Sequence, residues 1–323
     1  MSDREEKTGK NDNGKKNKGG KRNKIVAIEM IILVLLIMAA VAIFIQRDKS
    51  VKEAAKIHNQ KAKKTEQTPQ AAQKENEIEE ETEGTEEETG DRDEAVPDRS
   101  NFAVQPGVSV GTTEQSDEKI VYLTLDDGPS DNTQAVLDIL DKYNAKATFF
   151  VTGEMPEYKD MIKAAYDKGH TIGMHTYSHD YAKVYASVDA YFQDLDQIGQ
   201  MVQEEIGYVP CFIRFPGGSS NTVSKKYTAG IMSTLVQEVQ NRGYQYYDWN
   251  VSSGDGGTAT TEEIIAQSET DKYHQVMLLF HDAATKETTI EALPTVLEYY
   301  KNLGYSFKAI DRESLVVHHQ VNN

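Results

Sequence analysis

Residues 119–129 read Lys-Ile-Val-Tyr-Leu-Thr-Leu-Asp-Asp-Gly-Pro and begin the folded part of the chain that the sequence predicts. The apolar, β-branched and aromatic residues 120–125 are typical of a buried strand. Asp126 and Asp127 follow at its carboxyl end, where two adjacent carboxylates repel each other unless a cation or a shared proton offsets their charge. The pair therefore predicts one metal ligand and one general base, although a surface turn is an equally good interpretation of this stretch alone.

Six more apolar runs alternate with longer polar segments of helical period. Such alternation predicts repeated β–α units and an α/β fold with a mainly parallel sheet, but it does not decide whether the sheet closes into a barrel. Helix ends are marked by a capping box at Thr260 and Glu263 and by glycines at positions 169, 243 and 304. The seven predicted strands are residues 120–125, 147–151, 171–174, 211–215, 244–251, 276–280 and 306–310.

Three other predicted strands also end in residues that can carry chemistry. His175 and His179 are four residues apart and can bind one metal ion together with a third ligand from elsewhere. Arg214 can hold the aspartate that does not bind metal, through a bidentate contact. His281 is the natural proton donor to a leaving amine. The carboxyl ends of parallel strands meet at one edge, so the sequence predicts a single site built from these groups.

The other histidines and the one cysteine are not expected to take part in this site. Cys211 lies in an apolar run, is expected to be buried, and has no partner for an intramolecular disulfide. The remaining histidines, at positions 58, 170, 274, 318 and 319, are expected to face solvent.

Charge is distributed unevenly along the chain, whose net charge is −17. Residues 1–64 carry 16 basic and 7 acidic side chains, residues 65–118 carry 3 and 17, and residues 119–323 carry 16 and 28. A basic head before an apolar stretch indicates a membrane, and the acidic remainder gives no sign of a nucleic-acid surface.

Residues 25–45 are apolar apart from Glu29 and have about the length that a bilayer core requires. The basic tail, residues 1–24, places the N-terminus in the cytoplasm and the rest of the chain outside the cell membrane as a single-pass protein. A cleaved signal peptide is the alternative, but no Ala-x-Ala site follows the apolar run. Residues 46–118 are rich in Lys, Gln and Glu and predict a disordered acidic linker. Residues 119–315 form the predicted catalytic domain, and residues 316–323 the tail.

Taken together, the strand-end motifs resemble those of the polysaccharide deacetylases, carbohydrate esterase family four. The resemblance covers residues 119–312, and the motifs occur in the family's order. It implies a deformed (β/α) barrel and a metal-dependent hydrolase that removes N-acetyl groups from a polysaccharide, acting on carbon–nitrogen bonds other than peptide bonds.

The resemblance also implies a role for each matched residue. Asp126 matches the family's catalytic base, and Arg214 matches the arginine that holds this base. Asp127, His175 and His179 match the three metal ligands. Zn²⁺ is the expected ion for such a set, with Co²⁺, Mn²⁺ and Ni²⁺ as alternatives.

Four further matches concern the substrate, its leaving group and the acid that protonates it. The backbone N–H of Gly217 matches an oxyanion donor, Leu279 matches the leucine that lines the acetyl pocket, and His281 matches the catalytic acid. Asp255 matches the aspartate that pairs with this acid.

The chain departs from the family pattern at two aromatic positions. Gly256 follows Asp255 where the family usually has Trp, and Gly217 stands where an aromatic residue is common. The only tryptophan, Trp249, is expected in the core. The two missing aromatic residues predict a more open substrate groove.

The expected substrate is N-acetylglucosamine in the glycan strands of peptidoglycan, because an enzyme tethered outside its own membrane lies next to the cell wall. Another acetylated polymer remains an alternative: chitin-like chains, poly-N-acetylglucosamine or xylan. A catalytically silent wall-binding protein is the alternative from a different functional class.

Overall fold

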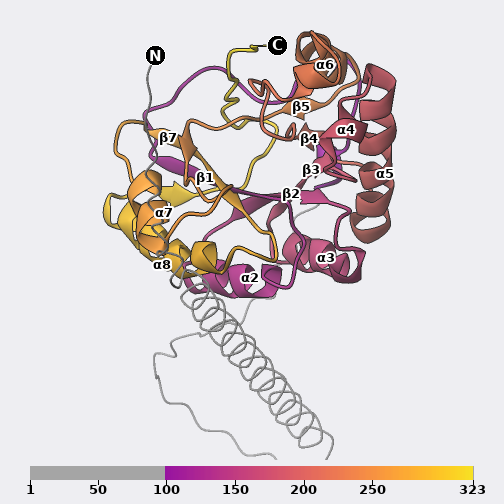
Figure 1. The fold of residues 1–323 in the computed structure, drawn as a ribbon. Helices are drawn as coiled ribbons and strands as arrows, with labels where there is room; N and C mark the ends of the chain where they lie inside the picture. The colour runs from indigo at the N-terminus through magenta and orange to yellow at the C-terminus, as the bar shows by residue number, and fades with distance from the viewer. Residues whose placement is uncertain (1–98, 323) are drawn as a thin grey trace, which may run out of the picture. The chain divides into compact units, whose positions relative to one another are not determined.

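A curled sheet of parallel strands forms the centre of the part of the chain that the computed structural model describes, residues 99–322 (Figure 1). The strand order is β5-β4-β3-β2-β1-β7-β6, and β8 pairs with the beginning of β1. The predicted α/β fold with parallel strands is therefore confirmed, in the form of a half-barrel. The strands are β1 Ile120–Asp126, β2 Ala147–Thr152, β3 Thr171–Thr176, β4 Phe212–Ile213, β5 Gln245–Tyr246, β6 Val251–Ser252, β7 Gln275–His281 and β8 Ser306–Phe307.

Residues 244–251, predicted as one strand, form two short strands instead. Between β5 and β6 the chain leaves the sheet, and the Asp248 N–H donates to the carbonyl oxygen of Val317 at 2.9 Å. Residues 316–319, predicted as part of a free tail, thus pack against the segment that joins the two edge strands. Periodicity could not reveal this split, because it depends on a contact between residues about 70 positions apart.

Helices surround the outer face of the sheet (Figure 1). The capping box is confirmed at the start of α7, where the Thr260 side chain accepts from the Glu263 N–H and the Glu263 carboxylate accepts from the Thr260 N–H. The predicted glycines at 169, 243 and 304 have φ of +86°, +90° and +80° beside helix ends. The helices are α2 Thr133–Lys142, α3 Asp160–Asp167, α4 Tyr181–Val184, α5 Val188–Ile206, α6 Ile231–Asn241, α7 Thr261–Ser268 and α8 Glu287–Asn302.

Strand β1 shows how the core determines the position of the site. All seven of its residues are buried. Val121, Leu123 and Leu125 belong to the larger apolar cluster, whereas Ile120 and Tyr122 belong to a second cluster. Because side chains alternate along a strand, Asp126 at its end lies on the same face as the second set.

The N-terminal boundary of the folded domain lies earlier than residue 119. Arg99 is buried and donates hydrogen bonds to the carbonyl oxygens of Tyr166 and His170. The Phe102 ring lies edge-on to Phe212, with 5.2 Å between ring centroids. The prediction of an unfolded linker up to residue 118 is therefore wrong for residues 99–112, where a few apolar side chains in a polar stretch pack against the domain.

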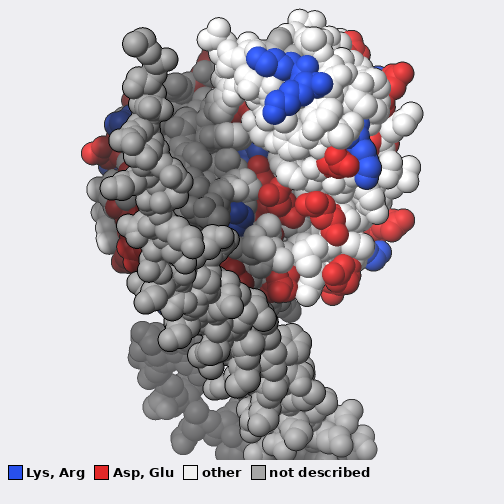
Figure 2. All heavy atoms as spheres, in the orientation of Figure 1, with Lys and Arg blue, Asp and Glu red and all other residues white. Residues whose placement is uncertain are grey.

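The predicted cytoplasmic tail, membrane helix and remaining linker, residues 1–98, lie outside the described residues. Among residues 99–322, no helix combines the length and apolar character needed to cross a membrane. On the face shown in Figure 2, Asp and Glu side chains gather near the middle, and Lys and Arg side chains form separate groups.

The predictions for Cys211 and the outlying histidines are partly confirmed. Cys211 is buried, as expected, and the side chain of His274 is 54% exposed. His170, however, is fully buried, and its Nδ1 accepts from the Ala147 N–H. His318 stacks on Tyr246 with 3.8 Å between ring centroids. The burial of His170 and the stacking of His318 result from tertiary packing, which the pattern of residues along the sequence does not encode.

Candidate active site

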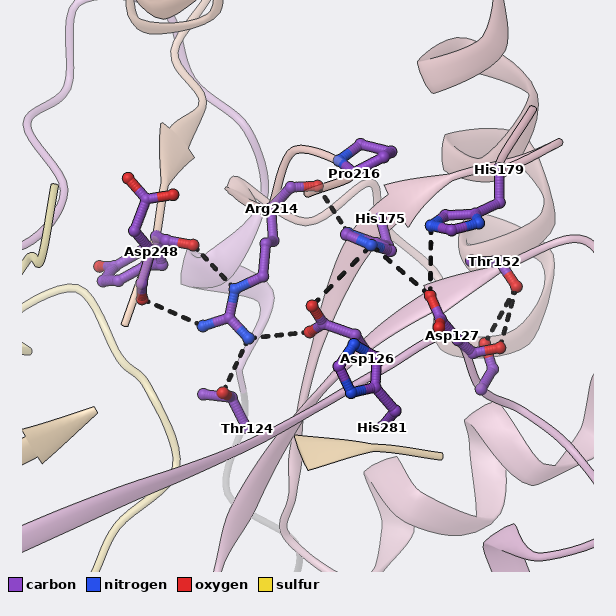
Figure 3. A network of polar contacts seen from close by, with 12 residues as sticks. Thr124, Asp126, Asp127, Thr152, His175, His179, Arg214, Pro216, Asp248 and His281 are labelled. Atoms are coloured by element: carbon purple, nitrogen blue, oxygen red, sulfur yellow. Dashed lines mark hydrogen bonds and ion pairs between the residues drawn. The ribbon is translucent and has the colours of Figure 1, made fainter. Parts of the chain in front are cut away.

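The register between β1 and β7 brings two predicted site residues together. Thr124 lies opposite Leu279, and Asp126 lies opposite His281. Both strands end at this last pair, and residues two apart on a strand share a face. Thr124, Asp126 and His281 therefore lie in one corner of the site (Figure 3), and Leu279 shares the strand face of His281.

The guanidinium of Arg214 is fully buried behind this corner. Its Nη1 donates to Asp126 Oδ1 at 2.8 Å and to Thr124 Oγ1 at 2.7 Å (Figure 3). Its Nε donates to the carbonyl oxygen of Tyr247 at 2.8 Å, and its Nη2 to that of Asp248 at 3.2 Å. The predicted bidentate contact with Asp126 is therefore wrong, since backbone carbonyls take up the other donors.

Asp126 is buried and lies against the charged guanidinium of Arg214. Burial raises the pKa of Asp126 above its ordinary value, although the positive charge of Arg214 offsets part of the rise. A buried carboxylate with a raised pKa accepts a proton more readily than an exposed one, and this is the property that a general base needs.

Asp127 points to different partners, His175 near the end of β3 and His179 after it. Its Oδ1 lies 3.6 Å from His175 Nε2 and 3.4 Å from His179 Nε2 (Figure 3). The three ligand atoms lie within 4.8 Å of one another. Asp127 Oδ1 is buried and has no hydrogen-bond partner among residues 99–322. A buried carboxylate oxygen without a donor is costly, and a cation between these atoms would remove the cost.

The protonation of His175 also fits a metal ligand. Its Nδ1–H donates to the carbonyl oxygen of Arg214 at 2.8 Å, which leaves the lone pair on Nε2 facing Asp127. Burial, together with the neighbouring His179, lowers the pKa of His175 to about 3. The imidazole is therefore neutral near pH 7, and a neutral imidazole oriented through its other nitrogen is the usual form of a metal ligand. The residues present thus fit a divalent cation.

Two of these three ligand candidates and one neighbouring residue have backbone angles in the left-handed region, which is uncommon for residues other than glycine. The φ angles are +72° at Asp127, +122° at Thr176 and +46° at His179. The register between β2 and β3 shifts beside Thr176. Strained backbone persists only where surrounding contacts impose it, and it concentrates at functional sites.

Asp194 on α5 supplies part of the support for this backbone. Its Oδ1 accepts from the N–H groups of Tyr177 and Ser178 at 2.5 and 3.1 Å, and its Oδ2 accepts from the Ser178 hydroxyl at 2.5 Å. Sequence reasoning missed this residue. An acidic side chain on the apolar face of an amphipathic helix, next to Leu195, was the signal that could have revealed it.

Asp282 supports the other strand end and was also missed. The Thr133 hydroxyl donates to its Oδ2 at 2.6 Å, and its own N–H donates to the carbonyl oxygen of Asp126 at 2.7 Å. Burial raises the pKa of Asp282 to about 7. Asp282 directly follows His281 in the chain and lies behind the turn that follows β1.

His281 is paired with Asp255, as the resemblance implied. Its Nδ1 lies 2.7 Å from Asp255 Oδ1, and its backbone N–H donates to Asp255 Oδ2 at 2.9 Å. The hydroxyls of Ser253 and Thr289 also donate to this carboxylate. Burial alone would lower the pKa of His281, but the hydrogen bond and the charge of Asp255 outweigh it, so the pKa lies above the ordinary value. The imidazole is thus a proton donor up to a higher pH than a free histidine.

Gly217 and Leu279, the other two residues that the resemblance matched, lie after β4 and within β7. Leu279 is buried, and Gly217 lies in a tight turn with φ of +74°. The Gly217 N–H makes no hydrogen bond within the described residues and is available as a donor. The hydroxyl of Tyr181 lies beside Gly217. Burial, with the charges of Asp127 and then Asp126, raises the pKa of Tyr181 to about 12, so its hydroxyl stays protonated.

Gly256, where the family usually has Trp, and the only tryptophan, Trp249, lie in different surroundings. A Cβ at Gly256 would lie 3.1 Å from His281 Cε1, so a side chain there would begin in contact with the imidazole. Trp249, expected in the core, is only partly buried, and its ring lies against Gly218. The prediction for Trp249 is therefore only half correct.

Comparisons with known proteins agree with this geometry. The family model described as polysaccharide deacetylase matches residues 113–236. A peptidoglycan-N-acetylglucosamine deacetylase of Bacillus cereus is 30% identical over 225 residues, which cover 65% of this chain and 78% of the relative.

Two solved structures resemble this chain. The catalytic domain of a peptidoglycan N-acetylglucosamine deacetylase from Eubacterium rectale is 42% identical with a TM-score of 0.63, covering 67% of this chain and 98% of that one. A polysaccharide deacetylase from Bacillus cereus is 30% identical with a TM-score of 0.53, covering 64% and 97%. The chain therefore belongs to the polysaccharide deacetylase family of metal-dependent hydrolases.

Proposed function

We propose that this enzyme removes the N-acetyl group of N-acetylglucosamine in peptidoglycan glycan strands. The Bacillus cereus and Eubacterium rectale relatives, which bear the name of this activity, support the choice of substrate. The observation that carries the chemistry is the division between two adjacent carboxylates. Asp126 is paired with Arg214, whereas within residues 99–322 no donor reaches the Asp127 oxygen that lies beside two imidazole nitrogens.

Asp127, His175 and His179 are the proposed metal ligands. Three ligands of this kind are typical of a catalytic Zn²⁺ site with an open position, and Zn²⁺ is the proposed ion, with Co²⁺, Mn²⁺ and Ni²⁺ as alternatives. When bound, the ion would polarise the acetyl carbonyl and acidify a water molecule.

Asp126 is the proposed general base, and it takes the proton of the attacking water. Arg214 fixes the Asp126 carboxylate through Oδ1 at 2.8 Å and leaves its Oδ2 facing the site. The raised pKa of Asp126 moves its proton affinity toward the value that efficient transfer at neutral pH requires.

His281 is the proposed general acid. Asp255 holds its Nδ1 side, so Nε2 is the nitrogen that gives a proton to the departing amine. The Gly217 N–H binds the carbonyl oxygen as negative charge develops on it, and Leu279 lies beside the acetyl methyl group. The complete set of groups favours catalysis over the alternative of a silent wall-binding protein.

We also propose that residues 25–45 anchor the enzyme in the cell membrane, with residues 1–24 in the cytoplasm and the catalytic domain outside. The apolar run and the basic residues before it support this topology. The acidic residues after the run would then separate the catalytic domain from the lipid bilayer.

Release of acetate tests the proposed reaction. The purified full-length chain should release acetate fastest from peptidoglycan, when compared with chitin oligomers, poly-N-acetylglucosamine and acetylated xylan. A chelator should lower the rate by about 10²-fold or more, because the site then lacks its charge, and added Zn²⁺ should restore it. Faster release from one of the other polymers would change the substrate, and binding to cell wall without any release of acetate would exclude the activity.

The pH dependence of the rate tests the acid. His281 must carry a proton to act, so kcat/KM should fall as pH rises through its raised pKa. Asp255→Asn removes the charge that stabilises the imidazolium and should move this alkaline limb to lower pH. His281→Ala should lose the limb and about 10²–10⁴-fold in rate, whereas His274→Ala, at a half-exposed histidine, should leave the profile unchanged. An alkaline limb that stays in place in Asp255→Asn would count against His281 as the acid.

Protease accessibility tests the topology. Protease added to intact cells should cut within the acidic residues 46–98 and release the catalytic domain, while a cytoplasmic protein in the same cells stays intact. A catalytic domain that becomes sensitive only after lysis would show the opposite orientation.

A further inference from the structure

A tyrosine that matches none of the expected site residues contacts the turn with the proposed oxyanion donor. Tyr181 begins the short helix α4, and a Cβ at Gly217 would lie only 2.6 Å from its hydroxyl oxygen and 3.1 Å from Asn221 Cβ. Real Cβ atoms do not approach other atoms to 2.6 Å, and φ at Gly217 is +74°. Only glycine at position 217 allows this hydroxyl to lie directly against the backbone of the turn.

The ring of Tyr181 is held between the turn and a proposed metal ligand. Its centroid lies 5.9 Å from that of His179 and 5.5 Å from that of Tyr185, both in edge-to-face geometry. The Tyr185 hydroxyl donates to the carbonyl oxygen of Pro216 at 2.8 Å, next to Gly217. The same pair of rings thus fixes the turn and the position of the Tyr181 hydroxyl.

The Tyr181 hydroxyl differs from that of Tyr185 because it makes no hydrogen bond within residues 99–322. Tyr181 is partly exposed, so its hydroxyl can reach a bound molecule. The hydroxyl lies beside the Gly217 backbone, and the ring lies beside His179. We expect the carbonyl oxygen of the acetyl group to lie between the Gly217 backbone and His179.

We propose that Tyr181 is a further catalytic residue, whose O–H donates a hydrogen bond to the acetyl carbonyl oxygen beside the Gly217 N–H. This role rests on the proposed deacetylation. When the water oxygen bonds to the carbonyl carbon, the carbonyl π electrons move to the oxygen, and the Tyr181 O–H and Gly217 N–H stabilise that charge. The electrons return as the C–N bond breaks and the nitrogen takes a proton from His281, while Tyr181 keeps its own proton throughout.

The proposal also accounts for the glycine at a position where the resemblance led us to expect an aromatic residue. A larger side chain at position 217 would occupy the place of the Tyr181 hydroxyl. Tyr181 on α4 thus brings an aromatic ring next to the position where Gly217 lacks one, and the prediction of a more open groove stays a prediction.

Tyr181→Phe removes the hydroxyl and keeps the ring. In the full-length, metal-loaded enzyme it should lower kcat by about 10²-fold, the usual loss for one oxyanion donor, with KM and metal content unchanged. Tyr273→Phe is the matched control, because Tyr273 is exposed and precedes β7 at the opposite end of the strand from His281. Inhibition by acetate, whose carboxylate presents oxygen to the same donors, should weaken about tenfold in Tyr181→Phe and not in Tyr273→Phe.

A second pair of variants separates the hydrogen bond from a packing role. Gly217→Ala brings a methyl group against the Tyr181 hydroxyl, so its loss of activity should be smaller in the Tyr181→Phe background than in the wild type. Additive losses would show that the two groups do not act together and would overturn the proposal.

The outcomes distinguish this proposal from the proposed function. Full activity of Tyr181→Phe in an enzyme that does release acetate overturns the role of Tyr181 and leaves the deacetylation intact. Loss of metal from Tyr181→Phe assigns the residue to the support of His179 and also overturns it. A wild-type chain that releases no acetate from any of the polymers overturns both proposals.

Discussion

The buried guanidinium of Arg214 is the interaction on which the geometry of the site depends. Its side chain connects Asp126 and Thr124 on β1 with the backbone at Tyr247 and Asp248. Its own carbonyl oxygen accepts from His175 Nδ1 and so orients the imidazole. One residue therefore fixes a proposed base through its side chain and a proposed metal ligand through its backbone. Removing the guanidinium would leave the Asp126 carboxylate buried without its charged partner, which costs several kcal/mol.

Asp126 and Asp127 are neighbours in the chain but reach different partners because of the backbone between them. Asp126 ends β1 in regular alternation and lies on the inner face, opposite His281. A regular extended residue at position 127 would direct its side chain to the other face of the sheet. The φ of +72° at Asp127 turns its carboxylate toward His175 and His179 instead. Local backbone strain thus gives two chemically identical side chains two environments. The Asp194 carboxylate supports the segment after β3, and the Asp282 carboxylate accepts from Thr133 in the segment after β1.

The sequence was sufficient for the long buried strands and for the meeting of Asp126, His175 and His281, since each lies at or next to a strand end. It was insufficient where structure depends on contacts between distant residues. Examples are the packing of residues 99–112, the segment between β5 and β6, and the burial of His170. The single contact between Arg214 and Asp126 depends on where backbone carbonyls lie, and no side-chain motif specifies that. Tyr181 escaped notice because a tyrosine after a histidine motif has no distinctive pattern, and its proximity to Gly217 becomes visible only in three dimensions.

The central claim is that the two adjacent aspartates have different roles, and metal content measured together with rate in their asparagine variants tests it most directly. Asp126→Asn should keep one divalent ion per chain and lose about 10²–10⁴-fold in rate, because its partner is Arg214 and its role is proton transfer. Asp127→Asn should lose the ion, and excess metal should restore part of its activity. A metal-free Asp126→Asn variant beside a fully loaded Asp127→Asn variant would contradict this account.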